Sequence, residues 1–327
     1  MSEPAPTLHL PARDIPIPTS VSPEAQAVLA MPALPVPERP PVDDVDGWRT
    51  MIADHDEAIA ALMAERASSG RVTTEERDVG GVHVYDITLD DLGAGDRRVY
   101  LDIHGGEFIF GAGEVCRAMA SGTANRVGAR VWAVDYRMPP AHPFPAGLDD
   151  CLTAYEALLA DHRPEEIIVG GASAGGNLAA ALILRARDDG LPLPAAAVLM
   201  TPGVDLTASG DSLQTNRGLD PLIPDGSSPA FGMYAAGHDL TDPYVSPLYG
   251  DFTKGFPPTI LSTGTRDMLL SDTVRMHRAL RVAGVPADLH VTEAGSHGGF
   301  FGMAPEDRQL EQEIRRFVDS HWPPATG

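Results

Sequence analysis

The sequence contains few cysteines and no long apolar run. Cys116 and Cys151 are the two cysteines of the 327 residues, and their spacing fits neither a disulfide framework nor a metal motif. We therefore expect free, buried thiols in a reducing compartment. No apolar stretch reaches the length of a membrane span, and the N-terminus lacks the basic start and apolar run of a secretory signal. The sequence predicts a cytoplasmic protein that does not enter the membrane.

Positive charge is also scarce. Lysine and arginine together number 24 against 46 aspartates and glutamates, which gives a net charge of −22. An acidic surface repels phosphate, and no stripe of basic residues interrupts it, so the composition argues against nucleic acid as a partner. A neutral small molecule is the kind of partner that this charge favours.

The remaining composition is that of a globular protein. Hydrophobic residues make up 43% and charged residues 21% of the chain, which is enough for a large buried core. The length suits one main domain with a small addition. We expect an N-terminal arm and cap helix over 1–66, a catalytic core over 67–201 and 256–327, and a cap insertion over 202–255.

The pattern of apolar residues supports this division. The first 43 residues are rich in proline and leave room only for a short helix over 23–31, whereas residues 45–66 show helical spacing. After Gly70, strand-like and helical stretches alternate, which predicts a doubly wound α/β sheet with parallel strands. The expected strands cover 82–89, 98–103, 130–134, 166–169, 196–201, 259–263 and 289–292, and the expected helices cover 117–127, 147–161, 174–188, 271–283 and 305–320.

The strongest chemical signal is the segment IIVGGASAGGNLAAALIL, in which an apolar strand meets Gly171, Ser173 and Gly175 and then a helix. This is a G-x-S-x-G sequence in the strand, sharp turn and helix context of a nucleophile elbow. The small flanking residues permit the strained turn that exposes the serine. A capping serine is the simplest alternative, and a phosphate loop is disfavoured because no Walker lysine follows.

A second signal is YLDIHGGEFIFG, where an apolar strand ends in His104, Gly105, Gly106 and Glu107. It corresponds to the HGGG-type loop whose backbone N–H groups stabilise an oxyanion. A structural Gly-Gly turn would give the same letters. Together with the serine motif, the loop favours acyl transfer through a serine nucleophile.

A base and an acid are expected after the serine in the chain. His297 lies in the glycine-rich loop GSHGGF directly after a strand, whereas His238, His277, His290 and His321 lie where packing or surface roles are expected. We therefore choose His297 as the base.

The acid is expected in the loop after the preceding strand. Asp267 follows that strand directly and is the preferred acid, which would fix the imidazole tautomer. Asp272 is its nearest rival but suits the start of the following helix. Asp205 and Glu293 also follow strands and stay open as weaker candidates.

From about Val99 to the C-terminus, the chain resembles the hormone-sensitive-lipase-like family of bacterial esterases. The resemblance rests on the ordered segments HGGEF, VDYRMPPAHPFPAGLDD, GGASAGGNLA, DLTASGDS, DPYVSPLYGD, GTRDMLLSD and GSHGGF. It implies an α/β-hydrolase fold with a mostly parallel eight-stranded sheet, a helical cap made from the N-terminal arm and the insertion after the sixth strand, and hydrolysis of carboxylic esters through an acyl-enzyme without a metal or organic cofactor.

The resemblance also assigns roles to individual residues. It places the nucleophile at Ser173, the acid at Asp267 and the base at His297. The oxyanion donors would be the backbone N–H groups of Gly106, Glu107 and Ala174, with Gly105 shaping the loop. His104 and Asp135 match positions that support the site in similar proteins.

Three residues depart from the family pattern. Glu107 replaces the third glycine of HGGG, and we expect its side chain to face solvent or to be held by an arginine. Ala172 replaces the usual acidic residue of GDSAGG, which removes a hydrogen bond at the turn. Gly203 stands where similar enzymes often carry tryptophan and would widen the acyl pocket.

The expected function is hydrolysis of short- to medium-chain carboxylic esters. A lactone or arylacetamide-type amide hydrolase is an alternative, because the same groups serve acyl transfer generally. A ligand-binding protein on a hydrolase scaffold is a further alternative, although such a protein would not need the base. A homodimer through the C-terminal strand and helix, 289–292 and 305–320, is also compatible with this architecture.

Overall fold

The computed structural model describes residues 7–32, 39–66, 72–93, 95–223 and 229–324. Parts of three expected segments therefore lie outside the described residues: 1–6 and 33–38 of the arm, 67–71 at the start of the core, and 224–228 of the insertion. No helix of the described residues is long and apolar enough to cross a membrane.

The core is one eight-stranded sheet with the order β1-β2-β4-β3-β5-β6-β7-β8. Its strands are β1 (Val72–Val79), β2 (Val82–Leu89), β3 (Val99–Ile103), β4 (Arg130–Asp135), β5 (Ile167–Ala172), β6 (Ala196–Met200), β7 (Thr259–Gly264) and β8 (Ala287–Thr292). From β4 through β8, every neighbouring pair is parallel. The predicted α/β fold with a mostly parallel sheet is confirmed.

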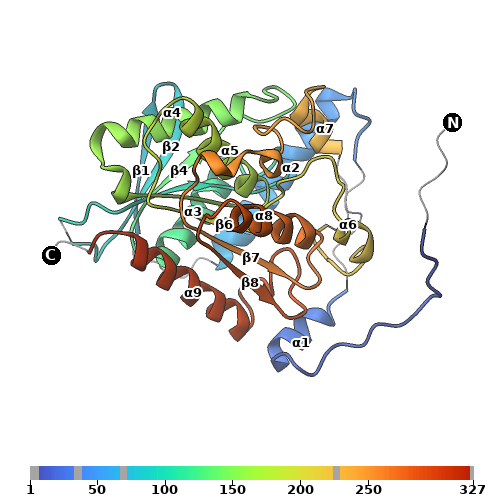
Figure 1. Ribbon diagram of the computed structural model, residues 1–327. Coiled ribbons are helices and arrows are strands. Elements are labelled where there is room, and N and C mark those ends of the chain that lie inside the picture. The colour runs from blue at the N-terminus through green and yellow to red at the C-terminus, as the bar shows by residue number, and fades with distance from the viewer. Residues whose placement is uncertain (1–6, 33–38, 67–71, 94, 224–228, 325–327) are drawn as a thin grey trace.

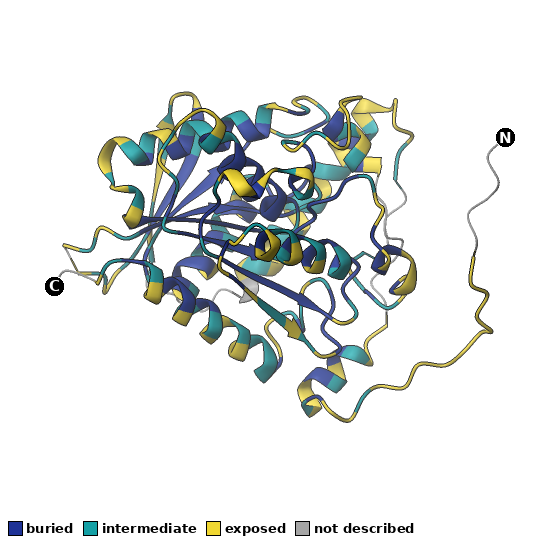
Figure 2. Cartoon of the chain, viewed as in Figure 1, coloured by how far each residue is buried: buried dark blue, intermediate teal, exposed yellow. Residues whose placement is uncertain are grey.

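Helices cover both faces of this sheet (Figure 1). One apolar cluster joins α4 (Ala146–Asp161), α5 (Ala174–Asp188) and α8 (Leu270–Val282) to one face, and a second joins α3 (Glu114–Val127) and α9 (Pro305–His321) to the other. The strands contribute alternately to the two clusters: Leu101 faces the first and Tyr100 the second. Figure 2 shows the result, a layer of buried strands between helices whose outer faces are exposed.

One strand was missed. The strand β1 was not listed among the expected strands, because its sequence VTTEERDV is mostly polar and carries no apolar signal, and none of its residues is fully buried. The strand β2 pairs antiparallel with both β1 and β4, and these two pairs are the antiparallel part of the mostly parallel sheet. A short turn at Gly80 and Gly81 connects β1 and β2, and such a turn can join only antiparallel strands.

The N-terminal part and the insertion pack over the carboxyl ends of the strands. The arm contains α1 (Pro23–Leu29), whose apolar side packs against Phe300 in the loop after His297. The next helix, α2 (Val45–Arg66), has the predicted bounds, and its Trp48 packs with Ile109, Phe110 and Ala230 of α7 (Pro229–Ala235). The insertion also contains α6 (Ser212–Thr215) and the short 3-10 helices η2 (Pro247–Tyr249) and η3 (Phe252–Lys254), while η1 (Pro164–Glu166) precedes β5.

Candidate active site

Ser173 lies on the sharp turn between β5 and α5. Its backbone angles are φ 57° and ψ −119°, a strained conformation for a residue with a side chain. Two backbone bonds hold the turn: the Ser173 N–H donates to the carbonyl of Met200 at 2.9 Å, and the Asn177 N–H donates to the carbonyl of Ser173 at 3.1 Å. The N–H of Ala174 belongs to the first turn of α5, where backbone donors have no partner within the helix.

The His104–Glu107 loop lies directly against this turn. A Cβ atom added to Gly105 would lie 2.8 Å from the carbonyl oxygen of Ala172 and 3.3 Å from the Cβ of Ser173. One at Gly106, whose φ is +116°, would lie 2.2 Å from the carbonyl oxygen of Phe110. Only glycine fits at either position, so the predicted glycine loop brings its backbone next to the serine.

His297 is held beside the same turn by two polar contacts. Its Nδ1 lies 3.1 Å from Oδ1 of Asp267 and 2.5 Å from the hydroxyl oxygen of Thr201. Thr201 directly follows β6, and the carbonyl of the preceding residue, Met200, accepts the N–H of Ser173. The imidazole therefore lies at the end of the strand that pairs with the serine strand. Thr201 has φ 42°, and its contact was not expected because a single threonine carries no motif.

Asp267 is completely buried and fully hydrogen-bonded. Besides His297, its Oδ1 accepts the N–H of Leu269 at 2.8 Å, and its Oδ2 accepts the hydroxyl of Thr263 at 2.7 Å. Burial works against ionisation of this carboxyl, but the adjacent imidazole and the hydrogen bonds hold the pKa of Asp267 below its ordinary value. It is therefore a carboxylate that faces the imidazole.

The other candidate acids do not contact His297. The carboxylate of Asp272 lies in the first turn of α8 and accepts the backbone N–H of Asp205 at 2.9 Å. Burial raises the pKa of Asp272 to about 7. Asp205 itself pairs with Arg275 at 2.6 Å, and Glu293 is exposed. Of the acids considered from the sequence, the structure brings only Asp267 to the imidazole.

Comparisons with known proteins agree with this arrangement. Residues 100–301 match the model of a family described as the α/β hydrolase fold. An acetyl-hydrolase of Streptomyces hygroscopicus is 37% identical over 58% of this chain, and the chain spans 64% of that protein's length. An esterase of Acinetobacter venetianus is 33% identical over 68% of this chain and 75% of its own length.

Solved structures of esterases also match this chain, and they cover a larger share of it than these two relatives do. The crystal structure of an esterase called E25 superposes with a TM-score of 0.90 at 36% identity and covers 97% of this chain and 99% of its own. An esterase from the bacterial hormone-sensitive lipase family superposes with a TM-score of 0.76 at 31% identity, over 92% of this chain and 99% of its own. This chain belongs to the hormone-sensitive-lipase-like carboxylic ester hydrolases. The predicted resemblance is confirmed.

In this hydrolase, the side chain of Glu107 is held by an arginine, one of the two arrangements that the sequence suggested. Arg39 of the N-terminal part binds it through both guanidinium Nη atoms, at 2.9 and 3.0 Å. Glu107 has φ 55°, so the oxyanion loop contains a strained residue whose side chain is tied to the arm. The ion pair is about one-quarter exposed, because the side-chain exposures of Arg39 and Glu107 are 25% and 23%.

Glu107 also acts on His297 through its charge. Burial opposes protonation of the imidazole, but Asp267 outweighs it, and the charges of Asp220 and Glu107 add to the effect, so the pKa of His297 is raised above its ordinary value. A general base must be neutral to accept a proton, so activity is expected to rise with pH through this raised pKa.

The Glu107→Gln variant is expected to move that rise to lower pH, because loss of one negative charge lowers the pKa of His297. The measurement is the pH dependence of kcat/KM for an ester between pH 5 and 9. The acidic limb of this profile reports the pKa of the base in the free enzyme. Glu156→Gln, on the exposed side of α4, is the matched control and should leave the limb in place. An unchanged limb in Glu107→Gln would show that the carboxylate does not act on the imidazole.

Asp220 is a site residue that the sequence did not reveal. It is 1% exposed and lies in the insertion. Its Oδ2 accepts the backbone N–H of His297 at 2.9 Å and that of Met268 at 3.2 Å, while its Oδ1 accepts the N–H of Leu222 at 2.9 Å. One carboxylate thus ties the loop of the base to the loop of the acid. No motif marks it among the many aspartates of the insertion.

The Asp220→Asn variant is expected to lower kcat on the order of 10- to 100-fold, because small displacements of catalytic groups have effects of that size. In asparagine, an NH₂ group replaces one of the two carboxylate oxygens. This group cannot accept a hydrogen bond, so the bond from the N–H of either His297 or Leu222 is lost. The KM should change little. Asp211→Asn, at an exposed position of the same insertion, is the control, and equal rates in the two variants would contradict this role.

Two other departures from the family pattern shape the site. Gly203 donates its N–H to the carbonyl of Ser173 at 3.2 Å, and a Cβ atom added there would meet Leu269 at an ordinary contact distance of 3.4 Å. No second atom of the described residues lies within 4 Å of that Cβ position, so one methyl group would fit there. Ala172 ends β5 and carries no polar group to bond across the turn.

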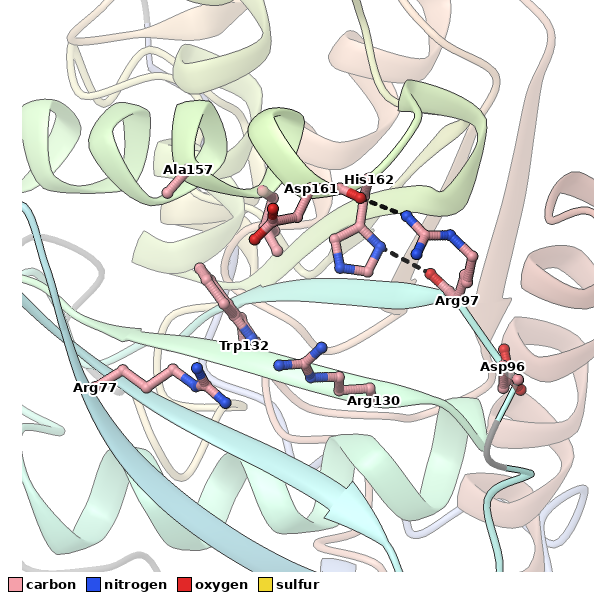
Figure 3. Close-up of a pocket in the computed structure, with 10 residues that line it drawn as sticks. Arg77, Asp96, Arg97, Arg130, Trp132, Ala157, Asp161 and His162 are labelled. Atoms are coloured by element: carbon pink, nitrogen blue, oxygen red, sulfur yellow. Dashed lines mark hydrogen bonds between the residues drawn. The ribbon is translucent and has the colours of Figure 1, made fainter.

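Figure 3 shows a separate cavity of about 550 Å³ that is lined by residues at the amino ends of β3 and β4. Ser173 follows the carboxyl end of β5, so the cavity lies at the opposite end of the sheet. Its arginines already have partners: Arg77 and Arg130 bind the buried carboxylate of Asp86, and Arg97 binds Glu166. The positive charges of these three arginines are therefore compensated within the fold.

Proposed function

We propose that this enzyme hydrolyses short- to medium-chain carboxylic esters through an acyl-enzyme on Ser173, with His297 as the base and Asp267 as the acid. The observation that carries the proposal is the Asp267–His297 pair, 3.1 Å apart, at the end of the strand next to the serine turn. Asp267 would hold the proton-bearing Nδ1 and leave Nε2 free to act on the serine.

The two half-reactions follow from this placement. His297 would take the hydroxyl proton of Ser173 as the oxygen attacks the ester carbonyl, and the resulting oxyanion would lie against the N–H groups of Gly106, Glu107 and Ala174, in a loop shaped by Gly105. Collapse breaks the bond to the alcohol, which leaves with the proton from the imidazole. Water then attacks the acyl-enzyme while His297 takes its proton. The bond between the acyl group and Ser173 breaks, the imidazolium returns the proton to the serine oxygen, and the carboxylic acid is released.

The surface of the insertion supports soluble substrates. In its described part, residues 202–223 and 229–255, the exposed large hydrophobic side chains are Leu222, Leu240 and Tyr249, each between 36% and 41% exposed. Binding to a lipid droplet requires a much larger contiguous apolar surface. Together with the space left by Gly203, this favours soluble esters with acyl chains that fit a pocket beside the serine.

A series of p-nitrophenyl esters from acetate to palmitate tests this proposal. We expect the highest kcat/KM at short to medium acyl length, and preference for long emulsified chains would overturn the substrate class. Gly203→Trp should shift the preference further toward acetate, because the indole would fill the space next to Leu269. Gly203→Ala, which adds one methyl group at ordinary contact distance, should leave the chain-length profile unchanged.

We also propose a cytoplasmic location and a homodimer. The two cysteines are free and buried, which suits a reducing compartment. The strand β8 is the last in the sheet order, and no other strand of the described residues pairs with its outer edge, so a second copy could pair there. Light scattering coupled to size exclusion tests the dimer, and the mass of a single chain would contradict it.

A further inference from the structure

Three potential metal ligands meet at the start of the oxyanion loop. His104 follows β3, Asp135 ends β4, and Cys116 lies in the first turn of α3, which connects these strands. The carboxyl ends of neighbouring parallel strands lie at one edge of the sheet, which brings His104 and Asp135 together. One nitrogen, one sulfur and one oxygen of the three side chains lie within 4.8 Å of one another.

The imidazole of His104 has an acceptor that nothing in the described structure satisfies. The residue is 4% exposed, its ring stacks on Tyr136 with centroids 4.2 Å apart, and its Nδ1 lies 2.7 Å from the carbonyl oxygen of Gly105. Because a carbonyl can only accept, Nδ1 carries the proton and Nε2 presents a lone pair. This Nε2 is buried and has no hydrogen-bond partner among the described residues. Such an atom is costly to leave unpaired.

The spacing suits a cation held by all three residues. Three points no more than 4.8 Å apart fit within a circle whose radius is about 2.8 Å, and zinc binds nitrogen at about 2.0–2.1 Å and sulfur at about 2.3 Å. Contraction by less than about 1 Å would therefore complete the bonds. A thiolate and a carboxylate also neutralise a divalent charge, which a buried site requires.

The neighbours of the ligands fit the same interpretation. Metal-binding histidines usually donate their other ring N–H to a carbonyl or carboxylate, as His104 does to Gly105. Asp135 is oriented by the N–H of Gly113 at 3.1 Å and by Nδ1 of His83 at 3.2 Å. His83 and Asp135 have side-chain exposures of 38% and 16%, so the carboxylate side of the cluster is partly exposed to solvent near the start of β2.

We propose that His104, Cys116 and Asp135 form a binding site for one zinc-like divalent cation. The ligands would be Nε2, a thiolate and a carboxylate oxygen, with water at the fourth position. On binding, Cys116 loses its proton to solvent and the cation gains a sulfur ligand. The site is independent of the proposed ester hydrolysis, although the ion would lie directly beneath the start of the oxyanion loop.

Titration of the chelator-treated, full-length protein with Co²⁺ tests the site, because a cobalt–thiolate bond gives an intense near-ultraviolet absorption band. We expect this band to saturate at one Co²⁺ per chain and to disappear when Zn²⁺ displaces cobalt. The Cys116→Ser variant should lack the band. The Cys151→Ser variant, which changes the other buried thiol, should keep it, and Asp135→Asn should weaken Co²⁺ binding at least 10-fold.

The outcomes are distinct from those of the esterase assays. A folded wild-type protein that shows no band and no stoichiometric metal would overturn the proposal, as would a band that survives in Cys116→Ser or is lost in Cys151→Ser. Zn²⁺ should also raise the thermal midpoint of the wild type and of Cys151→Ser, because a ligand that binds the folded state stabilises it. Circular dichroism checks the fold of each variant. If Cys116→Ser does not fold, the Co²⁺ affinity of Asp135→Asn tests the site instead.

Discussion

The Ser173→Ala variant is expected to lose turnover of p-nitrophenyl acetate on the order of 10⁶-fold in kcat, because the acyl-enzyme can no longer form. The residual rate would come from substrate binding and the N–H groups of the oxyanion loop. The variant should also fail to react with a p-nitrophenyl phosphonate, which adds one phosphonyl group to the wild-type chain. Initial rates and the intact mass of the protein measure the two effects.

Ser121→Ala is the matched control for this experiment. Ser121 is partly buried in α3, and its hydroxyl donates to the carbonyl of Arg117 at 2.9 Å, so its loss should leave both turnover and the phosphonate adduct intact. Unchanged thermal midpoints would show that the two variants fold alike. Turnover near the wild-type rate in Ser173→Ala would refute the acyl-enzyme mechanism.

The helices and strands predicted correctly from the sequence, and the motifs that led to the proposed site residues, are those that depend on neighbours in the chain. The helix Val45–Arg66 follows from the spacing of its apolar residues, and α5 follows from the alanine- and leucine-rich run after the glycine turn. Ser173 could be chosen because its strand, turn and helix are contiguous. His297 and Asp267 could be ranked because each lies in the loop that follows a strand.

The features that were missed depend on contacts between distant parts of the chain. Asp220 and His297 are 77 residues apart, so no local pattern pairs them. An arginine was expected as one possible partner of Glu107, but Arg39 lies 68 residues away and no local pattern identifies it. The strand β1 carries too few apolar residues for its pairing with β2 to be visible. Such residues are selected by the three-dimensional arrangement of loops around the site, which sequence spacing alone does not encode.

The Asp267→Asn variant is expected to lower kcat by about 10⁴-fold, the size of effect seen when the acid of such a triad becomes an amide. An asparagine amide could donate to Nδ1 and so favour the tautomer that carries its proton on Nε2, which cannot accept the serine proton. The loss of the carboxylate also removes the charge that stabilises the imidazolium and lowers the pKa of His297. The kcat of a short ester at the pH of maximum activity measures the change.

Asp272→Asn is the decisive comparison, because the two aspartates compete for one role and lie five residues apart in the sequence. Asp272 is buried with a pKa of about 7, so an amide resembles the protonated form that it already adopts in part, and its bond from the N–H of Asp205 can be kept by the amide oxygen. Its kcat should therefore stay within a few-fold of wild type. If Asp272→Asn lost activity and Asp267→Asn kept it, the acid would be Asp272, and the short Asp267–His297 contact would have only a structural role.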